Sequence, residues 1–188
     1  MKLRLIKRNQ KGFTLIELLV AIAIAAVVGV SITVCIQQVM VQTVFSNNQL
    51  TALNQVRNVG YWINHDVVMS QPGTEYVITV DNFTTARYEL LQLSKNEYPE
   101  VGKVRRFTYY FPSNTGFQDL HREDYNVTTT NKTDIVIAQY VDVANTNCIY
   151  VEPESGENFT PYISLNVTAQ YNNVVKSKTF QIGFRVTA

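Results

Sequence analysis

An apolar run that contains a single acidic residue is the feature that most constrains this chain. The run FTLIELLVAIAIAAVVGVSITVCI occupies residues 13–36, and Glu17 is its one charged side chain. A helix of 24 residues rises about 36 Å at about 1.5 Å per residue, which exceeds the roughly 30 Å hydrocarbon core of a bilayer. The run therefore predicts a membrane-spanning helix.

The charges beside this run predict its orientation. Residues 1–12 carry five basic residues and no acidic one, and no charged residue occurs from Leu18 to Val56. Because basic flanks remain on the cytoplasmic side, we expect residues 1–12 in the cytoplasm and the C-terminal part outside. Loss of residues 1–12 removes five of the 16 basic residues and none of the 15 acidic ones, which leaves a net charge of −4. Nucleic acid is therefore not indicated as a partner, since phosphate binding requires clustered lysine and arginine.

Two ordinary interpretations of the N-terminal segment leave Glu17 unexplained. One is a secretory signal peptide cut near Ala23-Ile24-Ala25, and the other is a plain signal anchor. A lone carboxylate in an apolar helix costs about 2.5–3.5 kcal/mol on insertion scales. Neither interpretation uses the carboxylate that carries this cost.

A third interpretation gives Glu17 a role. A cut between Gly12 and Phe13 creates a cationic α-amino group close to Glu17 in the sequence. In a bundle of such helices, the terminus of one subunit can lie beside the carboxylate of its neighbour, and each charge offsets the desolvation of the other. A glycine before the cut also allows the backbone to approach a protease closely.

Residues 11–21, KGFTLIELLVA, resemble the class III signal and helix start of type IV pilins and type II secretion pseudopilins. In that family a membrane-embedded prepilin peptidase cuts after the glycine and methylates the new terminal residue. The resemblance implies that Gly12 precedes the cut, that Phe13 becomes the N-methylated terminus, and that Glu17 is the assembly glutamate that pairs charges between subunits.

The same resemblance implies partners and a location. The partners are prepilin peptidase, other pilin or pseudopilin subunits and the assembly platform of the inner membrane. The subunit is expected first as a single-pass protein of the cytoplasmic membrane, with its N-terminus inside and its head outside. It then enters a periplasmic or cell-surface filament.

A helical pattern continues beyond the apolar run. Apolar or small residues recur at spacings of three and four, at Leu53, Val56, Gly60, Ile63 and Val67. The sequence Ser-Gln-Pro-Gly at 70–73 is typical of a helix end. We therefore expect one helix over about residues 13–70, with its C-terminal half packed on a head.

The remainder of the chain predicts a β-rich head. Segments rich in β-branched and aromatic residues predict strands at Glu75–Val80, Ala86–Leu93, Val104–Phe111, Asp134–Val141, Asn147–Val151, Tyr162–Gln170 and Thr179–Val186. Their spacing favours a mainly antiparallel sheet, and the fold class is α+β. The expected division is a leader over 1–12 that is removed, a spanning and filament-core half-helix over 13–36, an amphipathic half-helix over 37–71 and the head over 72–188.

The head also resembles the larger minor pilins and minor pseudopilins, in the helix end with Arg57, Trp62 and Asp66 and in a central hairpin over 105–122. It differs from the commonest major pilins because it lacks a cysteine pair that staples the C-terminal loop. It also lacks the acidic calcium loop of major pseudopilins. Both differences favour a minor subunit.

Residues with catalytic or metal-binding chemistry are few. Neighbours on a helix point in different directions, so His65 and Asp66 are not expected to form a dyad, and His121 is expected in a solvated loop. Two histidines with Cys35 and Cys148 do not give metal-ligand spacing. An intrachain disulfide would have to join the apolar run to the head. We therefore expect no intrachain disulfide, and pairing of Cys35 or Cys148 between chains stays open. We also expect no metal, no cofactor, no small-molecule substrate and no enzyme activity.

The sequence thus predicts a structural subunit, a minor pilin or pseudopilin of a type IV pilus-like or type II secretion filament. Two alternatives remain open. One is a major pilin of the shaft, and the other is a membrane-tethered extracytoplasmic module that binds or adheres to a surface, a secreted protein or incoming DNA.

Overall fold

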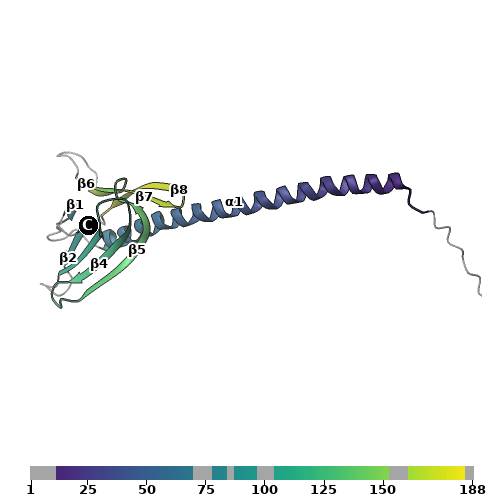
Figure 1. Ribbon diagram of the computed structural model, residues 1–188. Coiled ribbons are helices and arrows are strands. Elements are labelled where there is room, and N and C mark those ends of the chain that lie inside the picture. Colours follow the sequence, from purple (N-terminus) through teal and green to yellow (C-terminus); the bar gives the residue numbers. More distant parts are fainter. Residues whose placement is uncertain (1–11, 70–77, 84–86, 97–103, 153–160, 185–188) are drawn as a thin grey trace, which may run out of the picture. The chain divides into compact units, whose positions relative to one another are not determined.

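The computed structural model describes residues 12–69, 78–83, 87–96, 104–152 and 161–184. The chain divides into two compact units, Met1–Val44 and Phe45–Ala188, which are considered separately below. Helix α1, Leu15–Met69, contributes to both units. The second unit also contains a β-sheet, so the layout is α+β, as predicted (Figure 1).

In the first unit, α1 is an apolar helix without a buried side chain. Every described residue from 12 to 44 is exposed. The hydroxyls of Ser31, Thr33 and Thr43 donate to the carbonyls four residues earlier, at 2.9, 3.0 and 2.8 Å, so these polar groups are satisfied within the helix. The helix is long and apolar enough to cross a membrane, as the sequence predicts.

The head contains eight strands among its described residues, and every pairing is antiparallel. They are β1 (Ile78–Phe83), β2 (Tyr88–Asn96), β3 (Val104–Phe111), β4 (Phe117–Asn126), β5 (Lys132–Asp142), β6 (Asn147–Val151), β7 (Tyr162–Tyr171) and β8 (Val174–Gly183). The order across the sheet is β1-β2-β3-β4-β5-β7-β6, and β8 pairs with β7 (Figure 1).

The sheet has a weak joint between β5 and β7, where Val141 and Ala169 form the single registered pair. Just before this joint, Tyr140 adopts a φ of 59°, and the β4–β5 register shifts. The backbone N–H of Gln139 donates instead to Oε1 of Gln55 on α1, at 2.8 Å. The Gln55 side chain thus satisfies a backbone donor of β5 close to the residue at which β5 pairs with β7.

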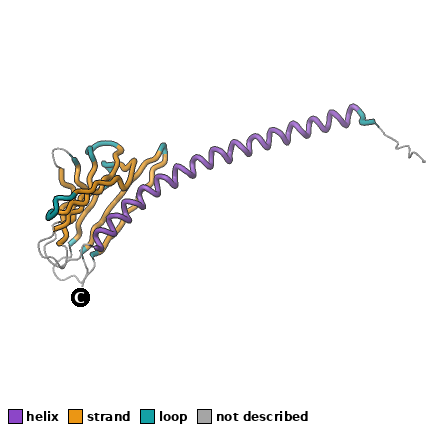
Figure 2. The backbone as a smooth tube through the Cα atoms, turned by 90° about the horizontal axis from the view of Figure 1, so that it is seen from below, coloured by secondary structure: helices purple, strands orange, loops and turns teal. Residues whose placement is uncertain are grey.

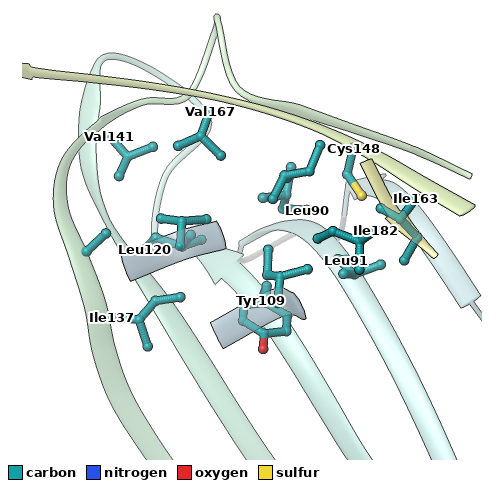
Figure 3. Packing of buried hydrophobic residues seen from close by; sticks show 14 of the residues in the cluster. Leu90, Leu91, Tyr109, Leu120, Ile137, Val141, Cys148, Ile163, Val167 and Ile182 are labelled. Carbon is teal, nitrogen blue, oxygen red and sulfur yellow. The ribbon is translucent and has the colours of Figure 1, made fainter. Parts of the chain in front are cut away.

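The core lies between the sheet and the C-terminal part of α1 (Figure 2). Val56, Val59, Ile63 and Val67 are fully buried on the helix, and Gly60 is buried between them. This confirms the predicted apolar stripe, of which Leu53 is only half-buried. Figure 3 shows the strand side of the core, with labelled side chains Leu90, Leu91, Tyr109, Leu120, Ile137, Val141, Cys148, Ile163, Val167 and Ile182.

The predicted strands over 104–111 and 147–151 agree with β3 and β6. The residue patterns predicted no strand at β4, but the hairpin over 105–122 that the family resemblance implied is present, formed by β3 and β4. The predicted start of the last strand was wrong, because β8 begins at Val174 rather than Thr179. Several positions of β4 hold charged residues that form ion pairs with other elements. The sequence of β4 therefore lacks the alternation of apolar and polar residues that predicts a strand. The predicted strand starts at 75 and 86, the predicted helix end over 70–73 and the last residues of the predicted strand over 179–186 lie outside the described residues.

Candidate functional site

The first turn of α1 is closed by Thr14 and Glu17. The backbone N–H and the hydroxyl of Thr14 both donate to Oε2 of Glu17, each at 2.9 Å. The backbone N–H of Glu17 donates to the hydroxyl of Thr14 at 3.4 Å. This reciprocal arrangement is a capping box, and it places a carboxylate at the positive end of the helix dipole.

Gly12 and Phe13 precede this turn and are both exposed, and Phe13 retains 87% of its accessible surface. A side chain at Gly12 would meet no atom within 4 Å. The bond between these two residues is therefore accessible and lies directly beside the capping box. The structure brings Gly12, Phe13 and Glu17 together within one short segment.

An open, mostly apolar groove runs beside the carboxylate. Phe13, Ile16, Val20 and Ile24 line it together with Glu17 and Ala21. These residues recur at helical spacing, so they form one side of the helix. Glu17 is the one charged group on a surface that otherwise suits lipid or another apolar helix.

The comparisons with known proteins agree with this geometry. Residues 7–33 match the model of the prokaryotic N-terminal methylation motif. This motif is the class III signal of type IV pilins, and here it overlaps a long apolar N-terminal helix. The match covers the N-terminal segment and supports a pilin or pseudopilin subunit. Comparison with curated proteins and with solved structures gave no match.

A second group of interacting residues lies inside the head, where Asp66 of α1 is buried against the sheet. Nε of Arg122 donates to Oδ2 of Asp66 at 2.6 Å, and Nη2 donates to Oδ1 at 3.0 Å. The hydroxyl of Tyr109 donates to Oδ2 of Asp66 at 2.5 Å. The guanidinium of Arg122 also lies over the rings of Trp62 and Phe107, at 5.1 and 4.7 Å.

The pKa values in this group follow from burial and charge. Burial raises the pKa of Tyr109 well above its usual range, and the adjacent Asp66 carboxylate raises it further. Burial opposes the charge on Arg122, but the hydrogen bonds to Asp66 outweigh that effect and raise the pKa of Arg122. Tyr109 therefore remains protonated and Arg122 charged over the physiological range.

The expectation that the side chains of His65 and Asp66 point in different directions was wrong. Nδ1 of His65 lies 3.2 Å from Oδ1 of Asp66. Both oxygens of Asp66 are already engaged by Arg122, and Tyr109 occupies one of them as well. The arrangement therefore fixes the helix on the sheet, and it presents no group activated as a base or nucleophile.

His121 was expected in a solvated loop, and this was also wrong, because it lies on β4 with 23% of its side chain exposed. Its ring stacks on Tyr110 at 5.1 Å between centroids, and Nδ1 lies 3.2 Å from Oδ1 of Asp134. The guanidinium of Arg87 lies 4.4 Å from the centroid of the Tyr110 ring. Neighbouring strands thus hold His121 within a stack of side chains on the sheet.

A carboxylate on the same strand is held by two cations. Glu123 lies 2.7 Å from Nη1 of Arg87 and 2.7 Å from Nζ of Lys132. Burial opposes ionisation of Glu123, but hydrogen bonds from Lys132 and Arg87 outweigh it and lower the pKa of the carboxyl. Within the described ranges, no group of three histidine, cysteine or acidic residues is placed to hold a metal ion.

Sequence reasoning missed Thr14 and the contact between Asp66 and Arg122. The first had a local signal, since threonine followed three positions later by glutamate is the pattern of a capping box. The second had none, because its partners are 56 positions apart.

Proposed function

We propose that this chain is a structural subunit, a minor pilin or minor pseudopilin, of a type IV pilus-like or type II secretion filament. Prepilin peptidase cuts it between Gly12 and Phe13 and methylates the amino group of Phe13. The observation that carries the proposal is the methylation motif over residues 7–33, which coincides with an exposed peptide bond beside a capped apolar helix.

Glu17 then acts in assembly by pairing with the new N-terminus of a neighbouring subunit. Its Oε2 accepts both hydrogen bonds from Thr14, whereas no described residue donates to Oε1. One carboxylate oxygen therefore holds the helix start and the other is available to a second chain. A charge pair formed in an apolar helix bundle offsets two desolvation costs and favours one axial stagger between subunits.

In this proposal residues 1–12 are the leader that is removed, and residues 13–36 span the membrane and later form the filament core. Residues 37–71 are the amphipathic half-helix and residues 72–188 the head. The N-terminus begins in the cytoplasm and the head lies outside, after which the subunit joins a cell-surface or periplasmic filament. Its partners are prepilin peptidase, other pilin or pseudopilin subunits and the inner-membrane platform.

The test of processing is the intact mass and N-terminal sequence of the protein from its native host, with and without prepilin peptidase. A chain that starts at N-methylated Phe13 only when the peptidase is present supports the proposal. A Gly12→Val variant should remain at full length, because a branched side chain hinders the backbone approach. A start at Met1, or after the alanines near residue 25, would refute it.

Assembly is tested separately with Glu17→Leu, and Glu17→Gln serves as the matched control for size. Both variants should be cleaved, but neither should enter filaments, since each removes the charge. Normal activity of Glu17→Leu would favour a tethered binding module instead. Recovery of the chain as the main component of purified filaments would favour a major pilin.

A further inference from the structure

We propose that the free edge of β8 binds an extended acidic segment of another protein, which adds to the sheet as a further strand. The segment carries acidic residues at alternate positions, opposite Lys176 and Lys178. This inference goes beyond the proposed function, because it assigns a peptide-binding edge to the head. Strand β8 and the residues that shape its edge all lie within one unit, Phe45–Ala188.

Strand β8 is a border strand of the sheet (Figure 1). Among the described strands it pairs with β7 alone, and the register is unbroken from Tyr171–Val174 to Tyr162–Gly183. The other border strands, β1 and β6, contain six and five residues, whereas β8 contains ten. Of the described borders, β8 therefore offers the longest row of backbone groups to a further strand.

The β7–β8 turn determines which residues of β8 present their backbone to this edge. The turn consists of Asn172 and Asn173, so the residues that flank it, Tyr171 and Val174, form a hydrogen-bonded pair. Hydrogen-bonded and non-hydrogen-bonded pairs alternate along an antiparallel ladder. The residues whose N–H and C=O groups point away from β7 are therefore Val175, Ser177, Thr179 and Gln181.

The outward backbone groups of these four residues are not covered by their own side chains. The hydroxyl of Ser177 donates to Oδ1 of Asn166 on β7 at 3.3 Å, and that of Thr179 donates to the same oxygen at 3.4 Å. Both side chains therefore lean towards β7 and away from the edge. All four residues are exposed, and no described group hydrogen-bonds to their backbone on the outer side.

The edge has few of the features that keep border strands from pairing with other chains. Natural sheets shorten such strands, interrupt them with proline or a bulge, cover them, or place lysines on them. Strand β8 contains no proline and shows no register shift against β7, so only its lysines could oppose an added strand. The charge of these lysines therefore decides which strand can be added.

Lys176 and Lys178 make the edge selective for acidic residues. They are two positions apart, so both lie on the same face of β8. Neither forms an ion pair with a described residue, in contrast to Lys132 of β5, and β6, β7 and β8 contain no acidic residue. A second copy of β8 on this edge would bring lysines together, whereas opposite charges on neighbouring strands attract. The edge thus disfavours a second β8 and favours an acidic strand.

The test uses the full chain in detergent micelles and a synthetic peptide about as long as β8. The peptide has blocked ends and alternates valine with threonine, except that two threonines in succession are replaced by glutamate. The matched control peptide carries lysine in place of glutamate. Fluorescence anisotropy measures binding, and hydrogen exchange shows which backbone amides the peptide protects. We expect the glutamate peptide to bind many-fold more tightly and to slow exchange on β8 at 175, 177, 179 and 181, but not on β1.

Two variants show whether the backbone edge and its lysines cause the binding. Thr179→Pro removes one outward N–H and should abolish binding, and proline is tolerated on an edge strand where the nitrogen faces away from the ladder. Lys176→Glu with Lys178→Glu should reverse the preference, so that the lysine peptide binds more tightly. Arg57→Glu on α1 changes an exposed charge elsewhere on the head and should leave the preference unchanged. If Thr179→Pro unfolds the head, the charge reversal decides.

Absence of binding, or equal affinity for the two peptides, would overturn the inference. So would binding without protection of the β8 amides, because the peptide would then lie elsewhere on the surface. Protection of β8 that rises with protein concentration in the absence of peptide would also overturn it, since a second copy of the chain would then occupy the edge.

Discussion

Arg122 on β4 forms a bidentate ion pair with Asp66 on α1. Nε of Arg122 lies 2.6 Å from Oδ2 of Asp66, and Nη2 lies 3.0 Å from Oδ1. Both residues are buried, and the hydroxyl of Tyr109 also donates a hydrogen bond to the Asp66 carboxylate. Because the contact is directional, it specifies which turn of the helix faces β4. The apolar stripe of α1 packs in the core of the head, whereas this pair fixes the register of the helix on the sheet.

Removing one partner of this ion pair should lower the stability of the head. We expect Arg122→Met to lower the free energy of unfolding by about 3–5 kcal/mol, because Asp66 is left buried with an uncompensated charge. The double variant Asp66→Leu with Arg122→Met should lose less than the sum of the two single changes. Urea unfolding in detergent, followed by the fluorescence of Trp62, measures both.

The control is Arg105→Met, which removes a contact with Asp124 at the surface. We expect a loss of at most about 1 kcal/mol, since exposed ion pairs contribute little. Strict additivity of the Asp66 and Arg122 changes would contradict the coupling.

Gly60 gives a prediction about the contact between α1 and β8. A Cβ at this position would lie 2.9 Å or less from three carbons of the Phe180 ring. Gly60→Ala should therefore destabilise the head by about 1–3 kcal/mol, although alanine is the better helix former. In a Phe180→Leu background the same change should cost much less, because the ring is gone. Thermal unfolding of the four proteins decides between these outcomes, and an equal cost in both backgrounds would exclude the ring as the cause.

The acid stability of the head should depend on Glu123. Its folded pKa lies below the usual 4.5 because Lys132 and Arg87 hydrogen-bond to the carboxylate. A lowered folded pKa means that the stabilisation is complete above pH 4.5 and is lost as the pH falls through the folded value. We expect the melting temperature to fall below about pH 4.5, and Glu123→Gln should make that fall shallower.

Asp119→Asn is the control on the same strand, since Asp119 forms no ion pair with a described residue. Its melting curve should keep the pH dependence of the unchanged protein. The same dependence in Glu123→Gln would assign the acid sensitivity to other groups, of which Asp134 is the next candidate because its pKa is also lowered.

The sequence predicts the parts of this molecule that depend on local patterns. The apolar run, the stripe from Val56 to Val67 and the motif around Glu17 all follow from residues a few positions apart. Strand β4 escapes such reasoning, because Arg122 and Glu123 are stabilised by Asp66, Arg87 and Lys132 from other elements. Charged residues can be buried on a strand only where distant segments supply their partners. The local pattern of a single sequence does not show which segments meet in the fold.

The capping box gives the last prediction, which concerns how Glu17 is held for assembly. Thr14→Val removes the hydroxyl that donates to Oε2 at 2.9 Å and keeps the backbone N–H that donates to the same oxygen. We expect normal cleavage and a several-fold decrease in the filament fraction, smaller than the loss caused by Glu17→Leu. Thr14→Ser should assemble normally, because serine retains the hydroxyl.

Ser31→Ala controls for the loss of any helix hydroxyl, since Ser31 donates only to the carbonyl of Val27. The measurement is the ratio of sheared filaments to membrane-bound subunit. Equal ratios for Thr14→Val and the unchanged protein would show that the Thr14 hydroxyl is not required to position the Glu17 carboxylate. The backbone N–H and the neighbouring subunit would then suffice to position it.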